Sequence, residues 1–352
     1  MQTRKDVEAG FSLIELMVAM VITLIITGAM FGLLTSGQGA FRTQPERTDR
    51  QQNMRMAMDV IMRDVQSAGV GMPNFVQTFA QNLNAKGPGN GPAGQPWDEI
   101  EILSNTSGFS PEDACHTPGG GKASPLRLQA GKSNVTGGPV MLFFWDGTYT
   151  VFYVTDTQKN STTADNCEGG ATHWQLNFNS GKNDPSGMNL ATGICQPNSF
   201  GIGNAGTGTK VMAECGNKAP CCDVQYVTNG SVVHYKIELD SANYPNLMRN
   251  ENGGPFQMLA RGIEDLQVQY VQADGTVSDG APLVVDPNYG SLITQARVTL
   301  SARATTERLQ GATVGGTAGV ALRGSLQSQA SPRQALWTVT QESPAPVTPR
   351  WN

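Results

Sequence analysis

The sequence predicts an α+β protein in which a long N-terminal helix packs on an antiparallel β-sheet. Two segments indicate the helix: an apolar run over residues 11–34 and an amphipathic stretch over residues 47–69. The sheet is indicated by several short stretches between residues 99 and 303 in which apolar and polar residues alternate. Alternation with a period of two is typical of antiparallel strands that bury one face. We therefore expect a helical N-terminal region followed by a β-rich body.

The apolar run is long enough to cross a bilayer. As a helix rising roughly 1.5 Å per residue, residues 11–34 would span about 36 Å. A cleaved secretory signal would have a shorter apolar core followed by small residues, whereas here a short polar leader ends at Gly10, before the run. Cleavage after Gly10 would leave the span attached. We expect a leader peptide over residues 1–10 and a transmembrane helix over residues 11–40.

Glu15 is the only charged residue within this run, and a carboxylate there needs a partner. Cleavage after Gly10 would give Phe11 a free α-amine, and the first helical turn offers unsatisfied N–H groups and a positive dipole end. Glu15 could neutralise the amine of its own chain, four residues away, or that of another subunit, which would fix their axial register. An acid that snorkels to the interface without a function is a third alternative.

The second helical segment, residues 41–69, has an apolar stripe that Gly69 ends. Its members recur at alternating four- and three-residue steps, and they are Met54, Met58, Ile61, Val65 and Ala68. A methionine stripe at this spacing is more often part of a core than a soft binding surface, so we expect it to lie on the sheet. Glycines and Pro45 between the two helical segments favour local kinking or melting as subunits pack.

The body, residues 70–304, is expected to contain strands separated by long loops. The predicted strands cover residues 99–103, 139–145, 148–154, 173–178, 231–239, 263–271 and 293–303. A hairpin turn is expected at Trp145, Asp146 and Gly147. Residues 70–97 are rich in breakers and predict a loop or an excursion off the helix. The C-terminal region, residues 305–352, looks mobile up to residue 335 and in its Pro-bearing tail, and is predicted to be flexible or partly ordered.

The cysteines cluster in the Gly-rich part of the body, and they are Cys115, Cys167, Cys195, Cys215, Cys221 and Cys222. An even number of clustered cysteines suggests disulfides formed in an oxidising compartment, which places the body outside the cytoplasm. The pairing stays open, although Cys221 and Cys222 are expected to have different partners because a bridge between neighbours is strained. A metal site is the alternative, but neither a CxxC pair nor a supporting histidine spacing is present.

The residues from Gly10 to Leu16, GFSLIEL, closely resemble the class III signal of type IV pilins and type II secretion pseudopilins. The resemblance implies that a prepilin peptidase cuts between Gly10 and Phe11, that Phe11 is then N-methylated, and that Glu15 governs docking into a growing filament. Residues 54–72, 259–277 and 293–304 also resemble PilW-like minor pilins and the related J-type minor pseudopilins. This resemblance implies a pilin-like fold, with the predicted disulfides in long loop insertions of the sheet.

The function implied is that of a minor pilin acting in initiation of pilus assembly or at the pilus tip. Its implied partners are prepilin peptidase, other minor and major pilins, the inner-membrane assembly platform, membrane lipid before assembly and, as a further candidate, a PilY-type tip adhesin. The chain would first be a single-pass inner-membrane protein with a periplasmic body and later part of an extracellular pilus. A minor pseudopilin of type II secretion and a membrane-anchored adhesive or binding ectodomain are the alternatives.

We expect neither an enzymatic activity nor a cofactor or metal. The glycine-rich stretches 201–206 and 203–210 lack the strand, helix and lysine spacing of nucleotide-binding loops. The histidines lie far apart in sequence, at His116, His173 and His234, without a hydrolase or zinc motif. An oxygen-rich stretch lacks the EF-hand spacing and favours a solvated turn over a Ca²⁺ site; it contains Asp274, Asp279, Asp286 and Asn288. The net charge of −5 gives no support for nucleic-acid binding.

Overall fold

The structure is a computed structural model that describes part of the chain. The described residues are 12–73, 76–80, 83, 85–86, 96–105, 111–114, 126–128, 135, 137–144, 149–160, 173–179, 189, 224–282, 292–304, 313–314, 317–318 and 323–333. All the cysteines, Gly10, Phe11 and the predicted turn at residues 145–147 lie outside these ranges, so the expectations for them stay predictions. The chain divides into two compact units, one of Met1–Gln51 and Ala304–Arg323, the other of Gln52–Arg303 and Gly324–Asn352.

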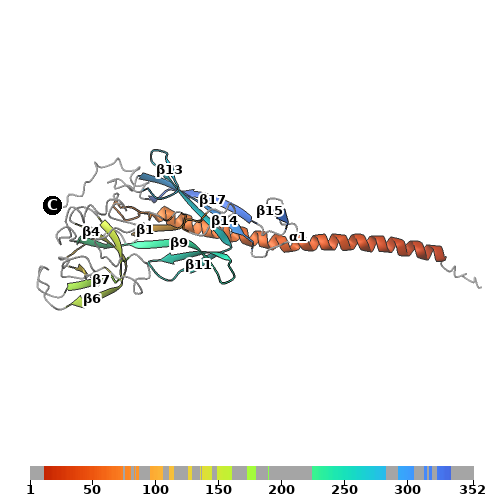
Figure 1. The fold of residues 1–352 in the computed structure, drawn as a ribbon, viewed down its shortest axis with the longest axis horizontal. Helices are drawn as coiled ribbons and strands as arrows, with labels where there is room; N and C mark the ends of the chain where they lie inside the picture. Colours follow the sequence, from red (N-terminus) through yellow and green to blue (C-terminus); the bar gives the residue numbers. More distant parts are fainter. Residues whose placement is uncertain are drawn as a thin grey trace, which may run out of the picture. The chain divides into compact units, whose positions relative to one another are not determined.

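The first unit contains most of helix α1, Leu13–Ser67, whose last part belongs to the second unit (Figure 1). The helix is continuous through Gly28 and Pro45, although a proline inside a helix removes one backbone hydrogen bond. The helix is therefore not melted between the two segments, and local kinking or melting on subunit packing stays a prediction. The first unit also holds a short antiparallel hairpin of β15, Thr313–Val314, and β16, Thr317–Ala318.

The second unit contains two four-stranded sheets that share one core with helix α1. The first has the order β1 (Ile100–Ser104), β9 (Ser231–Leu239), β10 (Pro245–Glu251) and β11 (Gln257–Arg261). The second has the order β13 (Val277–Ser278), β12 (Ile263–Gln272), β14 (Ile293–Arg303) and β17 (Arg323–Ala330). Because β12 follows β11 after a single residue, the chain passes directly from one sheet to the other (Figure 1).

Two smaller sheets complete the described part of the second unit. One has the order β2 (Glu112–Asp113), β8 (Val224–Asn229), β4 (Gly138–Phe144) and β5 (Tyr149–Val154). The other has the order β3 (Leu126–Arg127), β7 (His173–Asn177) and β6 (Asp156–Asn160). Their apolar faces form a core of their own, which includes Leu142, Phe152 and Leu176.

The main core confirms the predicted apolar stripe of helix α1. Met54, Met58, Ile61, Val65 and Ala68 are all buried there, against residues of both large sheets. Gly69 ends the helix with a φ of 71°, a conformation that glycine adopts without steric cost. Its N–H donates to the carbonyl of Leu103 at 3.0 Å, which ties the end of the helix to β1. The amphipathic half of the helix therefore lies on the sheet, as its sequence pattern predicts.

Each predicted strand is present, but the sequence patterns miss others. β9 and β14 have the predicted bounds, and the remaining predicted strands differ by one or two residues at their ends. β6, β8, β10 and β11 were not predicted, because their sequences contain few apolar residues in regular alternation. β17, Arg323–Ala330, lies beside β14 in the second sheet, which agrees with a partly ordered C-terminal region, and the mobility expected up to residue 335 stays a prediction. Leu326 packs against the main core and Ala330 is buried in it, so two apolar residues and the open edge of β14 order this polar segment.

The described part of the 70–97 stretch is not a simple excursion. Phe79 is fully buried and forms an isolated bridge with Ile102 of β1. The N–H of Leu103 donates to the carbonyl of Thr78 at 2.8 Å, and the N–H of Ala80 donates to the carbonyl of Glu101 at 3.0 Å. This segment therefore covers the outer edge of β1, whose backbone N–H and C=O groups would otherwise be free to pair with another strand.

Candidate assembly site

The predicted acid lies in a hydrogen-bonded first turn of helix α1. Ser12 immediately precedes the helix, and its hydroxyl accepts a hydrogen bond from the N–H of Ile14 at 3.3 Å. In return, the N–H of Ser12 donates to Oε2 of Glu15 at 3.0 Å. The first helical hydrogen bond runs from the N–H of Leu16 to the carbonyl of Ser12. This reciprocal pairing is a capping box, in which side chains satisfy two of the donors that a helix start leaves free.

The capping box gives Glu15 an intrachain partner that the sequence analysis missed. Its donor is the N–H of Ser12, which precedes the helix, rather than an N–H of the first turn, and the expected pairing with the amine of Phe11 stays a prediction. The signal was readable, because Ser-x-x-Glu before an apolar run is the sequence signature of this cap. The Glu15 side chain is exposed, and no described residue forms a hydrogen bond with its other oxygen, Oε1. That oxygen can accept a donor from outside the chain.

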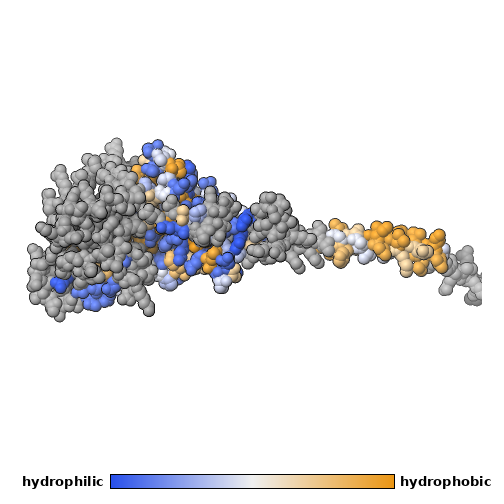
Figure 2. Space-filling view, in the orientation of Figure 1, coloured by the Kyte–Doolittle hydropathy of each residue, from blue (hydrophilic) through white to orange (hydrophobic). Residues whose placement is uncertain are grey.

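The helix that follows presents a largely apolar surface. Its 22 residues from Leu13 to Leu34 are long and apolar enough to cross a membrane, and none of them is buried (Figure 2). Ile14, Val18 and Ile22 share one face with Glu15, so the carboxylate lies at the head of an apolar stripe. Two threonine hydroxyls in the span donate to carbonyls four residues earlier, at 2.6 and 2.7 Å, and need no other partner. A surface of this kind requires lipid or other helices around it.

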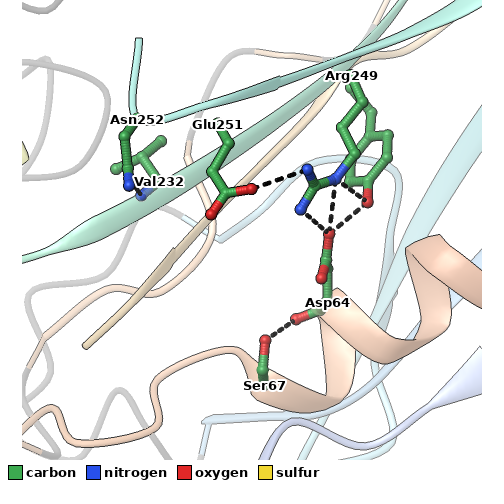
Figure 3. Close-up of polar contacts among 7 residues, drawn as sticks. Asp64, Ser67, Val232, Arg249, Glu251 and Asn252 are labelled. Carbon is green, nitrogen blue, oxygen red and sulfur yellow. Dashed lines mark hydrogen bonds and ion pairs between the residues drawn. The ribbon is translucent and has the colours of Figure 1, made fainter. Parts of the chain in front are cut away.

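A polar cluster fixes the other half of the helix to the first sheet (Figure 3). Asp64 projects from α1 toward Arg249 of β10, whose Nε and Nη2 donate to its Oδ2 at 3.2 and 3.1 Å. The hydroxyl of Tyr235, on β9, donates to the same oxygen. Arg249 also donates from Nη1 to Glu251 at 3.0 Å. One helix residue is thus held by two adjacent strands, which sets the rotation of α1 on the sheet.

The electrostatics of this cluster keep its proton on the tyrosine. Burial raises the pKa of Tyr235, and the hydrogen bond and negative charge of Asp64 raise it further. For Arg249, burial opposes the charged form, but hydrogen bonds with Tyr235 and Glu251 and the negative charge of Asp64 raise its pKa. The guanidinium therefore stays positive and the phenol stays neutral at physiological pH, as the observed donor pattern requires.

The remaining sequence candidates are separated in the structure. His234, on β9, contacts Glu99 with its Nε2 at 2.7 Å, His173 lies on β7, and His116 is outside the described residues. The carboxylate of Asp274 accepts from the N–H of Thr276, which is a turn contact. Asp279 accepts from a glutamine amide of β12. Within the described part of the chain, no three histidine, cysteine or acidic side chains gather where they could hold a metal. Residues 201–210, Asp286 and Asn288 lie outside it.

Comparison with known proteins adds one finding. Residues 6–31 match the family model of the prokaryotic N-terminal methylation motif. No curated protein and no solved structure matched the chain. The matched segment contains both the capping box and most of the exposed apolar helix. This class III signal, together with the exposed apolar helix, supports membrane anchoring of the chain.

A signal of this class, on an apolar helix followed by antiparallel sheets, indicates a protein of the type IV pilin or pseudopilin type. It implies processing by a prepilin peptidase and assembly with other pilin-type subunits in general. The fold agrees with a pilin-like α+β architecture in its described part.

Proposed function

We propose that the chain is a minor pilin of a type IV pilus, of the PilW-like kind, that acts in initiation of assembly or at the pilus tip. Prepilin peptidase removes residues 1–10, and the new N-terminus at Phe11 is methylated. The protein does no chemistry itself. It is anchored in the inner membrane with a periplasmic body before assembly, and it joins other minor and major pilins through the assembly platform.

The observation that carries this proposal is the position of Glu15 at the head of an exposed apolar helix. Its Oε2 is used within the chain by the N–H of Ser12, while Oε1 is open to a donor from outside. The amine that cleavage creates at Phe11 of another subunit is such a donor. Pairing it with Glu15 satisfies a charge that costs about 2.5–3.5 kcal/mol at the centre of a membrane and less near its surface. The gain is available only when helices align in one axial register.

Two substitutions of Glu15 separate its charge from its capping role. Glutamine fits a capping box as glutamate does, so Glu15→Gln removes the charge and keeps the cap, whereas Glu15→Ala removes both. We expect both variants to reach the membrane and to be depleted from sheared filaments by a similar factor, because assembly depends on the charge. Quantitative mass spectrometry of filaments and membranes measures this depletion. Incorporation of Glu15→Gln at the wild-type level would contradict an assembly role for the charge.

The same spectra test processing. An N-methylated peptide beginning at Phe11 in wild-type filaments would establish both cleavage after Gly10 and residence in the pilus. The peptide in membranes but never in filaments would leave a role confined to initiation. Normal pili with failed release of secreted proteins would instead indicate the first alternative, a minor pseudopilin of type II secretion, since the class III signal is common to both systems.

The second alternative is an anchored ectodomain, adhesive or binding, that only shares the export signal. It predicts that Glu15→Ala changes neither piliation nor the location of the chain. A PilY-type adhesin is a candidate partner for a subunit at the tip. Co-isolation of such an adhesin with wild-type filaments, and its loss from filaments that lack this chain, would support the tip position.

A further inference from the structure

Two arginines and a tyrosine form a second polar site at the junction of the two large sheets. Tyr244 lies in the turn between β9 and β10, where Asp240 accepts hydrogen bonds at 2.9 Å from the N–H groups of Ala242 and Tyr244. The N–H of Asp240 in turn donates to the carbonyl of Tyr244 at 3.0 Å. These bonds close the turn on itself and hold the tyrosine ring in place.

Gly262, the single residue between β11 and β12, fixes the far end of the same ring. Its φ is 80°, and an added Cβ would lie 2.7 Å from the hydroxyl of Tyr244 and from the carbonyl oxygen of Arg303. That hydroxyl donates to the same carbonyl at 3.1 Å. The N–H of Gly262 donates to Pro245 and its carbonyl accepts from the N–H of Arg303, both at 2.9 Å. The ring is therefore clamped between three backbone segments.

The guanidinium groups of Arg261 and Arg303 both lie against this ring. Their central carbons are 5.1 and 4.9 Å from its centroid, within the range of cation–π contact. Arg303 donates from Nη2 to a turn carbonyl, but its buried Nε has no partner in the described structure. None of the ion pairs among the described residues includes either arginine.

The site also contains an acid, Asp240, whose pKa responds to the charge of one of these arginines. The N–H of Tyr244 lowers the pKa of Asp240 most, and the positive charge of Arg261 lowers it further. Asp240 nevertheless forms no ion pair with Arg261 among the described residues, and its Oδ1 accepts the two hydrogen bonds of the turn. Arg261, Arg303 and Asp240 together carry a net positive charge, on a chain whose net charge is −5. Holding two like charges on one ring is unfavourable unless an anion joins them.

The site lies where helix α1 enters the second unit. Asn53 donates from its side chain to the carbonyl of Arg261 at 3.4 Å, so the end of β11 adjoins the start of the packed helix.

We propose that Arg261 and Arg303, set on Tyr244, bind a carboxylate-bearing segment of a neighbouring pilin-type subunit. This inference rests on the proposed function. Guanidinium groups pair with carboxylates in a forked geometry, so two of them on a rigid ring select an acidic segment, and a chain with a net charge of −5 offers such segments to its neighbours.

A zero-length crosslink tests the contact directly in filaments. The substitution Arg261→Lys keeps the charge and adds a primary amine, which a carbodiimide joins only to a carboxylate in contact with it. We expect an isopeptide between position 261 and an Asp or Glu of another pilin subunit. Arg55→Lys, on the exposed face of α1, is the matched control and should give no such peptide. A crosslink only to Asp240 of the same chain, or none at position 261, would overturn the proposal.

A charge-removal variant gives a second, independent measurement. We expect Arg261→Gln with Arg303→Gln to lower the ratio of filament to membrane protein about tenfold, as loss of a partly buried charge contact does. Arg55→Gln should leave the ratio unchanged. A ratio at the wild-type level in the double variant, while Glu15→Gln is depleted, would overturn this inference and leave the proposed function standing. Absence of the wild-type chain from filaments, together with normal piliation when the chain is deleted, would overturn the proposed function itself.

Lipid binding is the competing outcome. Full-length chain in nanodiscs of phosphatidylcholine, with or without phosphatidylglycerol, can be compared by amide hydrogen exchange over residues 240–244 and 261–263. The proposal expects no difference between the two lipid compositions. Protection that appears only with the anionic lipid, and disappears in the double variant, would assign the site to lipid phosphate instead.

Discussion

Arg249 and Asp64 connect strand β10 to helix α1 through two hydrogen bonds that converge on one carboxylate oxygen. Their side chains are only 26% and 17% exposed, between the limits of a surface pair and a buried one. We expect Arg249→Met to lower the free energy of unfolding of the second unit by about 2 kcal/mol, because Asp64 loses a charged partner in a poorly hydrated place. Urea unfolding of the full chain in mild detergent, followed by tryptophan fluorescence, measures the change.

Glu251 provides the control for that prediction, since it bonds the same guanidinium from a position that is 56% exposed. Glu251→Gln should cost about 0.5 kcal/mol or less, as most surface pairs do. Equal costs for the two variants would mean that Arg249 stabilises the fold through its stem alone, without a contribution from Asp64.

Two residues of α1 that lie five positions apart should differ sharply in how much they stabilise the fold. Ile61 is fully buried, whereas Met56 is 51% exposed. Ile61→Ala should lower the free energy of unfolding by about 3 kcal/mol, since it leaves a cavity in a packed core, and Met56→Ala by less than about 0.5 kcal/mol. The same urea experiment compares them. A small effect at Ile61 would show that the amphipathic half of the helix is not held on the sheet in solution.

The chain offers a matched pair of glycines with positive φ. Gly262 has a φ of 80° and no room for a Cβ, while Gly275 has a φ of 86° and nothing within 4 Å of an added Cβ. Gly275→Ala should therefore cost about 1 kcal/mol for backbone conformation alone. Gly262→Ala adds a clash with the carbonyl of Arg303 and should lower the free energy of unfolding by about 2 kcal/mol more than Gly275→Ala does. Thermal unfolding of both variants measures the difference, and equal losses would contradict the clamped position of Tyr244.

The stability of the body should depend on pH through Glu101. Burial raises the pKa of this acid, the charge of His234 on the adjacent strand lowers it, and Glu99 raises it again, with a net upward shift. An acid whose pKa is raised on folding binds more protons in the folded state, so stability falls as pH rises from the ordinary value of 4.5 through the folded value. Glu101→Gln should therefore be more stable than the wild type at neutral pH.

That advantage should shrink as the pH falls toward 4.5, where the wild-type carboxyl is also neutral. Asp274 supplies a control of opposite sign, because the N–H of Thr276 holds its pKa below the ordinary value. Asp274→Asn should be less stable than the wild type at neutral pH, and this deficit should vanish in acid. Urea midpoints between pH 2 and pH 8 compare the variants, because the Asp274 contribution is lost only below the ordinary pKa of 3.8. A pH-independent difference for Glu101→Gln would rule out a charge penalty at that position.

Local sequence patterns determined the elements that carry strong periodicity and the first turn of the helix. The apolar stripe from Met54 to Ala68 and the alternation in β9 and β14 appear in the structure as predicted, because each pattern is set by which face of one segment meets a core. Glu15 and its partner Ser12 are three residues apart, so the capping box is equally local and its spacing is visible in the sequence. The Ser-x-x-Glu spacing is present in the sequence, although the capping box was not predicted from it.

Tertiary structure alone decided the contacts between distant segments. Asp64 and Arg249 are 185 residues apart, and β10 has too little apolar alternation to be predicted as a strand. The contact between these two residues therefore cannot be predicted from the sequence. β17 is polar and becomes ordered because β14 offers an unpaired edge beside it. The pairing of Arg261 with Arg303 around Tyr244 likewise requires the turn, the crossover at Gly262 and the end of β14 to meet. Such contacts depend on which backbone groups and faces remain to be satisfied once the local elements have formed, and a segment's own residues do not encode that.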